Sequence, residues 1–485
     1  MTAEAIGKTV TSVIPARLDR LPWSPFHTRL VLALGVAWIL DGLEITVASA
    51  IGATLAEPST LALSSAAVGL IATVYLVGEV VGALVFGRLS DRWGRRKLFM
   101  ITLGIYLGGS GLTALTLGSG PGWILFLYAT RFVAGMGIGG EYAAINSAID
   151  ELIPARYRGR IDIAVNGSYW FGSILGTLGT LFLLNVLDPS IGWRLGFLIG
   201  PVLAVFILVL RRHLPESPRW QVMHGREKDA ERSIAYIEQQ VRDAGTDLAD
   251  VDDSKAIQLR PERSHGYLAL LRVLFSMYPK RSILGATLMI TQSFLYNAIF
   301  FTYTLVLGKF YGVPASATPL YLIAFAVGNF IGPLVLGHLF DSLGRRKMIS
   351  GTYILSGVLL AISAFLFNAG LLNAVTQTIA WCVIFFFASA GASAAYLTVS
   401  EIFPLEVRAM AIAVFFAIAQ CFGALGPVLY GFLIGDGSDR TALLYGYLLA
   451  AGIMIVGGLV EVFLGIDAEN KSLEDVAKPL SFAGA

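Results

Sequence analysis

Ionisable side chains stand inside stretches of this sequence that are otherwise apolar. Asp41 and Glu44 lie three residues apart in one stretch, Arg131 stands about ten residues into another, and Glu79 and Glu141 are further acids of this kind. An isolated charge in lipid costs at least ~2.5–3.5 kcal/mol, so we expect these groups to pair. Because acids outnumber the arginine, a spare carboxyl that is neutral when dry and charged when wet could carry a proton. A purely structural ion pair is the alternative.

The composition indicates the medium in which these groups are held. The chain has 485 residues, of which 56% are hydrophobic and 14% charged. Soluble domains carry about 25% charged residues, so this chain is too apolar to cover a soluble surface. The net charge of +2 gives no indication of a nucleic-acid partner. We therefore predict an integral, multi-pass membrane protein.

Apolar stretches near the ~20-residue length that spans a bilayer fall into two groups of six. We predict an N-terminal tail at 1–27, a six-helix bundle at 28–211, a polar linker at 212–281, a second bundle at 282–464 and a C-terminal tail at 465–485. In the linker, Ala230, Ile234, Ile237 and Val241 repeat at helical spacing, which predicts an amphipathic helix against the membrane face. The twelve predicted spans are 28–50, 67–89, 98–118, 121–145, 162–184, 192–211, 282–307, 318–340, 347–367, 373–399, 408–434 and 441–464.

Basic residues predict the orientation. They gather in the loops after the second, fourth and eighth spans and are nearly missing from the opposite loops. Cytoplasmic loops carry such an excess. We expect both termini and the linker to be cytoplasmic and the membrane to be the plasma (inner) membrane.

Two motifs occur twice at one common offset. Gly87-Arg-Leu-Ser-Asp-Arg-Trp-Gly-Arg-Arg-Lys97 returns 250 residues later as Gly337-His-Leu-Phe-Asp-Ser-Leu-Gly-Arg-Arg-Lys347. Glu151-Leu-Ile-Pro-Ala-Arg-Tyr-Arg158 returns at the same offset as Glu401-Ile-Phe-Pro-Leu-Glu-Val-Arg408. The chain is thus a doubled unit, and in secondary transporters such halves rock about a shared site.

The first repeated motif resembles the signature loop of the major facilitator superfamily. Pro215-Glu-Ser-Pro-Arg-Trp220 after the sixth span, together with the second motif, resembles the sugar porters and related metabolite–proton symporters. The resemblance implies an all-α fold of two pseudo-symmetric six-helix bundles with a cytoplasmic helical insert. It also implies a charged cytoplasmic gate that joins the halves, for which the alternative is ordinary surface ion pairs. The implied gate residues are Asp91, Arg95, Glu151, Arg158, Glu216, Arg219, Asp341, Arg345, Glu401 and Arg408.

A narrower resemblance concerns the intramembrane charges. Gly42-Leu-Glu44-Ile-Thr-Val is similar to the first helix of bacterial xylose–proton symporters, in which an aspartate couples the proton and pairs with a fourth-helix arginine. Glu44 and Arg131 match those two residues. Asp41-Gly-Leu-Glu44 resembles the paired acids of aromatic-acid–proton symporters. We predict proton coupling by Glu44, Asp41 and Arg131, with Glu44 as the main carrier.

The seventh span carries a polar stripe of Gln292, Tyr296 and Tyr303. Hydrogen bonding between helices is the simpler explanation for any one of these residues. Gln292 and Asn297, however, match the sugar-binding amides of the family. Asn166 and Ser173 stand where sugar porters carry glutamines, and Tyr396 replaces the tryptophan on which a sugar stacks. The predicted substrate-binding residues are Asn166, Gln292, Tyr296, Asn297 and Tyr396.

The leading prediction is proton-coupled symport of a small polar metabolite, either a sugar or polyol or an organic or aromatic acid. The alternatives are a uniporter, a drug–proton antiporter and, from another class, a transporter-like nutrient sensor. No metal-ligand spacing, nucleotide loop or nucleophile–base set indicates an enzyme or a cofactor. Trp170 and Trp381 are interpreted as packing or interface residues. We expect a monomer.

Overall fold

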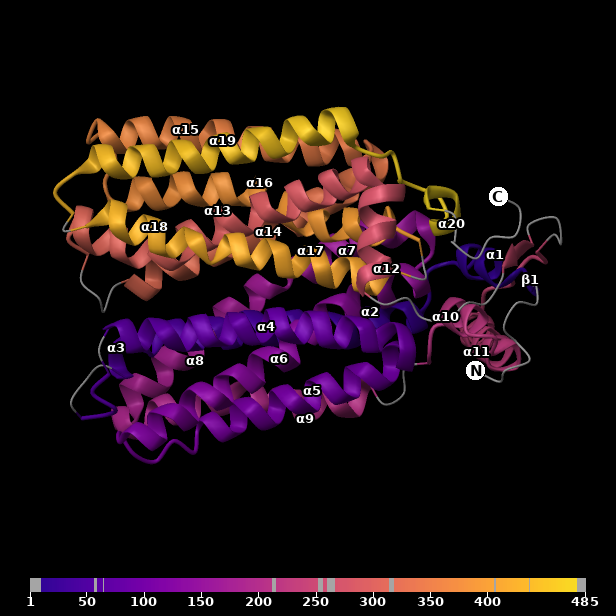
Figure 1. Ribbon diagram of the computed structural model, residues 1–485, viewed down its shortest axis with the longest axis horizontal. Coiled ribbons are helices and arrows are strands. Elements are labelled where there is room, and N and C mark those ends of the chain that lie inside the picture. The colour runs from indigo at the N-terminus through magenta and orange to yellow at the C-terminus, as the bar shows by residue number, and fades with distance from the viewer. Residues whose placement is uncertain are drawn as a thin grey trace.

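A computed structural model describes residues 10–55, 59–63, 65–211, 215–251, 256–259, 267–313, 318–404, 407–435 and 437–477. Its helices form two bundles that lie side by side, with smaller elements gathered beyond one end (Figure 1). In the described part of the chain, nine helices are long and apolar enough to cross a membrane. The apolar parts of α9 and α17 are shorter.

The first bundle contains the helices of the N-terminal half. Its members are α2 (Pro25–Ala50), the short α3 (Gly52–Leu55), α4 (Ser65–Trp93), α5 (Arg95–Thr113), α6 (Pro121–Leu152), α7 (Ala155–Gly167), α8 (Tyr169–Val186) and α9 (Pro189–Arg211).

The second bundle repeats this arrangement in the C-terminal half. Its members are α13 (Pro279–Tyr311), α14 (Thr318–Ser342), α15 (Arg345–Asn368), α16 (Ala374–Glu401), α17 (Arg408–Gly423), α18 (Leu425–Ile434) and α19 (Arg440–Leu464).

The fifth and eleventh predicted spans are each divided into two helices. The break between α7 and α8 lies at Ser168, whose hydroxyl donates to the carbonyl oxygens of Val165 and Gly35. Such side-chain bonds to the backbone compete with helical hydrogen bonds. The break between α17 and α18 lies at Ala424, between Gly423 and Gly426. Equivalent spans of the two halves are therefore interrupted in similar places.

Two helices of the first bundle pack with their backbones in close approach. Gly78 of α4 lies against the carbonyl of Phe132 in α6, and Gly135 and Gly139 of α6 lie against the carbonyls of Tyr75 and Glu79. A Cβ at any of these glycines would overlap the facing backbone. Small residues spaced four apart allow this packing in membranes. As a result, the backbone of α4 is fixed at Glu79.

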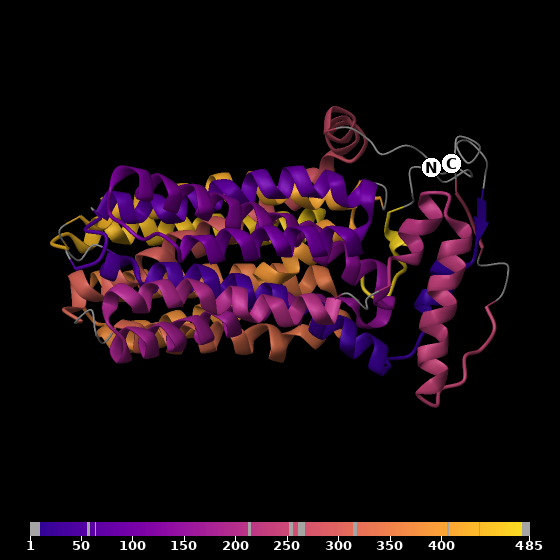
Figure 2. The same cartoon turned by 90° about the horizontal axis from the view of Figure 1, so that it is seen from below.

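The polar elements form a layer across one end of the bundles. Strand β1 (Val10–Ser12) pairs antiparallel with β2 (Ile257–Leu259), and α11 (Glu227–Asp243) lies across the bundle ends (Figure 2). The four predicted apolar positions of α11 are all fully buried, but against the protein and not against the membrane face that we expected, because α11 packs on α1, α2 and α10. The remaining elements of this layer are α1 (Ile14–Asp19), α10 (Pro218–Met223), α12 (Tyr267–Arg272), the π-helix η3 (Val273–Met277) and α20 (Leu473–Val476).

The segment 1–27 is more than the tail that we expected from its sequence. Its described part forms β1, α1 and the start of α2. Arg17 and Arg20 of this segment both pair with Glu238 of α11. The order has two causes: Ile14, Leu18 and Leu21 are buried in the hydrophobic core, and the linker supplies Glu238 as the partner of the two arginines.

Candidate functional site

The centre of the first bundle holds a buried ion pair. Arg131 of α6 donates from Nη1 to Glu44 Oε1 of α2, and both side chains are at most 1% exposed. Glu44 also accepts from Ser110 at 2.6 Å and from the Tyr106 hydroxyl at 3.0 Å, both on α5. Three helices therefore converge on one carboxylate. Of the intramembrane charges that we expected to pair, Arg131 and Glu44 form an ion pair, whereas Asp41 and Glu79 accept from uncharged side chains.

Asp41 is buried one helical turn from Glu44 but has different partners. Its two oxygens accept from the hydroxyls of Tyr142 on α6 and Tyr75 on α4, the latter at 3.2 Å. The guanidinium of Arg131 stacks on the Tyr75 ring, 4.5 Å from its centroid. Tyr75 thus separates Asp41 from Arg131.

A cavity lies between the two bundles, with an empty volume of about 800 Å³, part of which is open solvent. Aromatic rings and uncharged polar groups line it. The lining residues are Trp38, Ile45, Leu76, Tyr142, Asn166, Gly167, Tyr169, Trp170, Gln292, Ser293, Tyr296, Asn297, Phe300, Ser389, Ala392, Ser393, Tyr396, Phe416 and Gln420.

Contacts link this cavity to the ion pair. Tyr142 lines the cavity and donates to Asp41, Asp41 accepts from Tyr75, and the Tyr75 ring holds Arg131 against Glu44. A change of charge at the ion pair can therefore be transmitted to the cavity wall through two tyrosines.

All five predicted substrate-binding residues line the cavity. Asn166 stands next to the break between α7 and α8 and donates to the carbonyl of Asp162 at 2.8 Å. Tyr296 presents its ring to the cavity, whereas its hydroxyl donates to Asn329 at 2.9 Å. Asn297 donates to the Ser293 carbonyl at 2.9 Å, and Tyr396 interacts with Gln292.

Two residues that the sequence placed beside these lie elsewhere. Tyr303 is fully buried between helices, where its hydroxyl lies 3.0 Å from the hydroxyl of Thr378. Ser173 accepts from Thr46 at 2.8 Å, a contact between α8 and α2. Both residues join helices, which is the simpler explanation considered for the polar stripe.

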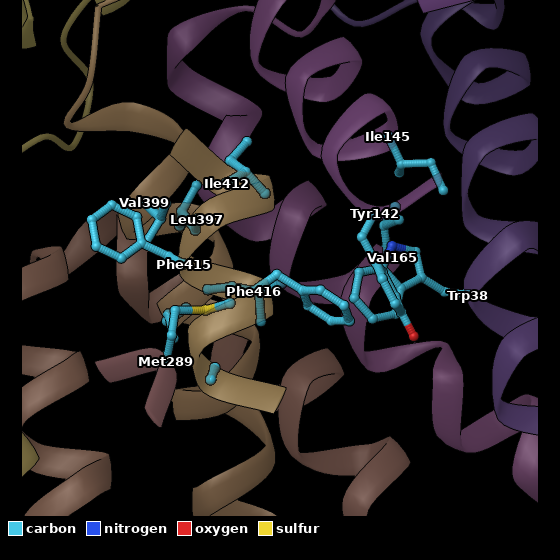
Figure 3. Packing of buried hydrophobic residues seen from close by; sticks show 14 of the residues in the cluster. Trp38, Tyr142, Ile145, Val165, Met289, Leu397, Val399, Ile412, Phe415 and Phe416 are labelled. Carbon is cyan, nitrogen blue, oxygen red and sulfur yellow. The ribbon is translucent and has the colours of Figure 1, made fainter. Parts of the chain in front are cut away.

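Sequence reasoning missed several aromatic residues of the cavity. Trp170, interpreted from its sequence as a packing or interface residue, lines the cavity with its ring 5.6 Å from that of Tyr296. Trp38, Tyr142 and Phe416 meet between the bundles, and the Phe416 ring points toward Tyr142 with 4.5 Å between centroids (Figure 3). Aromatic residues are common in all spans, so only their position in space distinguishes these.

Within each bundle, the repeated motifs form matching ion pairs at the end that carries the polar layer. Arg95 pairs with Glu151 at 2.8 Å, and the equivalent Arg345 pairs with Glu401 at 2.9 Å. Glu216 accepts from the backbone N–H of Arg95 at 2.9 Å, at the N-terminus of α5. Burial raises the pKa of Glu216, although its backbone donors oppose the shift.

The N-terminus of α15 has an acid in the same place. Glu469 accepts from the backbone N–H of Arg345 at 3.4 Å, as Glu216 does from Arg95. Gly94 and Gly344 precede the two helices with φ of 92° and 103°, a conformation that favours glycine. The spacing of glycine and arginine in the repeated motif therefore has a structural cause.

Other gate residues connect the two bundles. Arg158 of α7 lies 3.5 Å from Glu401 of α16, and the Arg160 backbone N–H donates to Asp341 of α14 at 2.8 Å. Arg219 of α10 pairs with Glu474 of α20 at 3.1 Å. These contacts hold the ends of the two halves together beside the polar layer.

Three observations extend or limit the predicted gate. Asp19, which the sequence did not indicate, pairs with Arg219 at 2.9 Å and lies 3.7 Å from Arg158. Arg408 donates to the carbonyl of Phe403 at 3.3 Å. The side chain of Asp91 lies outside the described residues.

Among the described residues, no group of three or more His, Cys, Asp or Glu side chains is arranged to hold a metal ion.

Comparisons with known proteins agree with this architecture. The family model for sugar (and other) transporters matches residues 43–479. The niacin transporter NiaP of Acinetobacter baylyi is 26% identical over 95% of this chain and 99% of its own length. YdjK of Escherichia coli, named for metabolite transport, is 28% identical over 95% of this chain and 96% of its own length.

A solved structure supports the fold. The proton:xylose symporter XylE bound to 6-bromo-6-deoxy-D-glucose superimposes with a TM-score of 0.78. The superposition covers 93% of this chain and 98% of that chain at 20% identity. The predicted major facilitator fold, with twelve transmembrane helices in two pseudo-symmetric bundles, is confirmed.

Proposed function

We propose, on the premise that the chain belongs to the family of sugar and other transporters, that it is a proton-coupled symporter of a small aromatic acid. Transport of a small molecule across a membrane follows from the family. The coupling ion and the class of substrate are the proposal. The observation that carries it is the continuous path from the aromatic cavity through Tyr142, Asp41 and Tyr75 to the Glu44–Arg131 pair.

Proton coupling is supported by the chemistry of the buried ion pair. While Glu44 is charged, it holds Arg131 in place. Protonation of Glu44 removes that attraction, and an arginine left without its partner in a dry site is costly. The two protonation states of Glu44 therefore favour different arrangements of α2, α5 and α6. Asp41, with its two tyrosine donors, positions the cavity wall beside this switch.

The cavity lining favours an aromatic acid over a sugar. Trp38, Tyr142, Tyr169, Trp170, Tyr296, Phe300, Tyr396 and Phe416 supply eight of its nineteen residues. A flat ring gains ~0.5–1.5 kcal/mol from each good aromatic contact beyond the area that it buries. Gln292 presents an amide that can donate to a carboxylate, whereas Asn297 and Gln420 already donate to Ser293 and Glu79. The similarity to a niacin transporter points to the same chemical class, a carboxylate on an aromatic ring.

Alternating access requires a gate that opens. The contacts of Arg158 with Glu401 and of Asp341 with the Arg160 backbone join the halves on the side of the polar layer. We assign this side to the cytoplasm, with both termini there and the protein in the plasma membrane, because the basic loops lie on it. The structure then corresponds to a state whose cytoplasmic gate is closed. Transport requires these contacts to break.

The test is uptake of labelled nicotinate into proteoliposomes that contain the purified protein. With a more acidic exterior, we expect accumulation against the nicotinate gradient by the wild type and loss of accumulation by Glu44→Gln. Glu44→Gln keeps the shape of the side chain, and exchange of nicotinate without a proton gradient serves as its control. Uphill, pH-driven accumulation by Glu44→Gln would refute the assignment of Glu44.

A sugar is the second candidate, because Gln292 and Asn297 match the sugar-binding amides of the resembling family and both line the cavity. Inhibition of nicotinate uptake by competing compounds distinguishes an aromatic acid from a sugar. Benzoate and nicotinamide, added in excess, test the ring and the carboxylate separately, and xylose and glucose test the sugar. Inhibition by sugars without inhibition by aromatic acids would replace the proposed substrate while leaving the coupling scheme in place.

A further inference from the structure

Glu79 is a buried acid that the scheme above does not use. It lies in the middle of α4, where Gly135 and Gly139 of α6 fix the helix backbone, and its side chain is fully buried. The side chain points across the bundle interface, where Glu79 Oε2 accepts from Gln420 Nε2 of α17 at 3.1 Å. The other oxygen, Oε1, has no hydrogen-bond partner among the residues that the structure describes.

The orientation of Gln420 is set by its second contact. Ser293 of α13 donates to Gln420 Oε1 at 2.9 Å, which leaves the Gln420 NH₂ group to face Glu79. Ser293 is itself held by Asn297, whose Nδ2 lies 3.2 Å from the Ser293 hydroxyl. Ser293, Asn297 and Gln420 all line the cavity. Glu79 is therefore joined to the substrate cavity by a single amide.

The three acids near Arg131 differ in how well their charged forms are compensated. Glu44 accepts from a guanidinium and two hydroxyls, and Asp41 accepts from two hydroxyls. Glu79 accepts from one amide. A buried carboxylate costs several kcal/mol unless donors replace its water. Glu79 is the acid whose neutral form best fits the observed contacts.

Some charged groups around Glu79 favour its charged form and others oppose it. The negative charge of Asp41 on α2 repels the charged form of Glu79. The positive charge of Arg131 on α6 attracts it, although Arg131 is bonded to Glu44. Glu141 of α6 is a further acid that acts on Asp41 and has interactions of its own. The guanidinium of Arg131 is therefore the positive charge that attracts both Glu44 and Glu79.

We propose that Glu79 binds a second proton that moves with the substrate. This inference rests on the proposed function. The proton comes from external water to the Glu79 carboxylate, and the neutral side chain then lets the bundles close through Gln420. When the cytoplasmic side opens, Gln420 leaves with the second bundle, water reaches Glu79, and the proton passes to the cytoplasm. An aromatic monoanion then enters with two protons, and each cycle moves one positive charge inward.

The test compares nicotinate uptake and transport current in the same proteoliposomes for the wild type and Glu79→Gln. The glutamine can still accept from Gln420 but cannot hold a proton. We expect inward positive current with uptake in the wild type, and uptake without net current in Glu79→Gln. With a tenfold proton gradient and no membrane potential, accumulation should fall from about 100-fold to about 10-fold, because each coupled proton contributes one factor of ten. Current and accumulation unchanged in Glu79→Gln would overturn the inference.

A second measurement separates this inference from the proposed function. Infrared spectra of the purified protein without substrate, recorded at neutral pH, should show a protonated-carboxyl band that is absent in Glu79→Gln. If the wild type does not accumulate nicotinate, the proposed substrate fails, and this band alone decides the state of Glu79. No difference in the band would overturn the inference. Loss of the band in Asp41→Asn but not in Glu79→Gln would assign the proton to Asp41 and also overturn it.

Gln420→Leu serves as a second variant if Glu79→Gln does not fold. It removes the one N–H that favours the charged form of Glu79 while keeping the carboxyl. We expect the pH at which transport current falls to half to move upward relative to the wild type. An unmoved pH dependence would contradict a titrating Glu79.

Discussion

Removing the Arg158 side chain should favour the state that is open to the cytoplasm. Arg158 lies 3.5 Å from Glu401 and 3.5 Å from the carbonyl of Lys471 in the second half of the chain. Its contact with Asp19, at 3.7 Å, stays within the first half, because Asp19 also accepts from the Ala155 backbone. Opening therefore breaks the contacts with Glu401 and Lys471, and Arg158→Ala removes that cost.

The size of the shift follows from these distances. A hydrogen bond to a charged group contributes ~1.5–3 kcal/mol at good geometry, and 3.5 Å is the outer limit for such a bond. Two contacts at that limit give about 1.5 kcal/mol together, which is about tenfold in the ratio of open to closed forms. The pairing of Glu401 with Arg345 keeps that acid compensated in the variant.

The assay uses a cysteine at Ile145, which is 1% exposed on α6 between Tyr142 and the end that we assign to the cytoplasm. In a Cys382→Ser, Cys421→Ser background, Ile145→Cys is alkylated by a membrane-impermeant maleimide in inverted vesicles. We expect about tenfold faster alkylation in Arg158→Ala. Arg160→Ala is the matched control, because its exposed side chain stacks on Tyr157 and its hydrogen bond to Asp341 comes from the backbone, which the substitution keeps. Equal rates in both variants would refute a gating role for Arg158.

Three further predictions concern the cavity, the packing and the polar layer. Trp170→Ala should weaken nicotinate binding about 2–10-fold through loss of a ring contact, whereas Trp381→Phe, buried outside the cavity, should leave binding unchanged in a titration. Gly135→Val should lower the free energy of unfolding by ~1–3 kcal/mol or more, because its Cβ would overlap the Tyr75 carbonyl. Gly104→Val, whose side chain would face open space, should leave the melting temperature unchanged. Burial opposes the charged form of Glu238, but hydrogen bonds from Arg17 and Arg20 outweigh it and lower its pKa. The stabilisation of α1 is therefore complete above pH ~4.3 and is lost as pH falls through the folded-state pKa. Hydrogen exchange of residues 13–20, corrected for intrinsic rates, should rise as the pH falls below ~4.3, and Glu238→Gln should show fast exchange already at neutral pH. Equal exchange in Glu238→Gln and the wild type at neutral pH would contradict this role.

Much of the architecture is determined by local properties of the sequence. Hydropathy and span length indicate a membrane protein of twelve helices, and motifs repeated 250 residues apart indicate two equivalent halves. The apolar spacing of α11 predicts its buried face correctly. Such features depend on residues close to one another along the chain, so the sequence alone determines them.

Only the tertiary structure determines which groups meet. The resemblance to proton symporters implied that Arg131 pairs with Glu44, but nothing in the order of residues indicates that Tyr75 stands between Arg131 and Asp41, or that Glu79 reaches Gln420, 341 positions away. The same holds for Trp170, whose role as a cavity wall depends on the rotation of α8 toward α13. These contacts are set by how helices pack across the two bundles. Packing depends on shape and charge between distant segments, which no local pattern records.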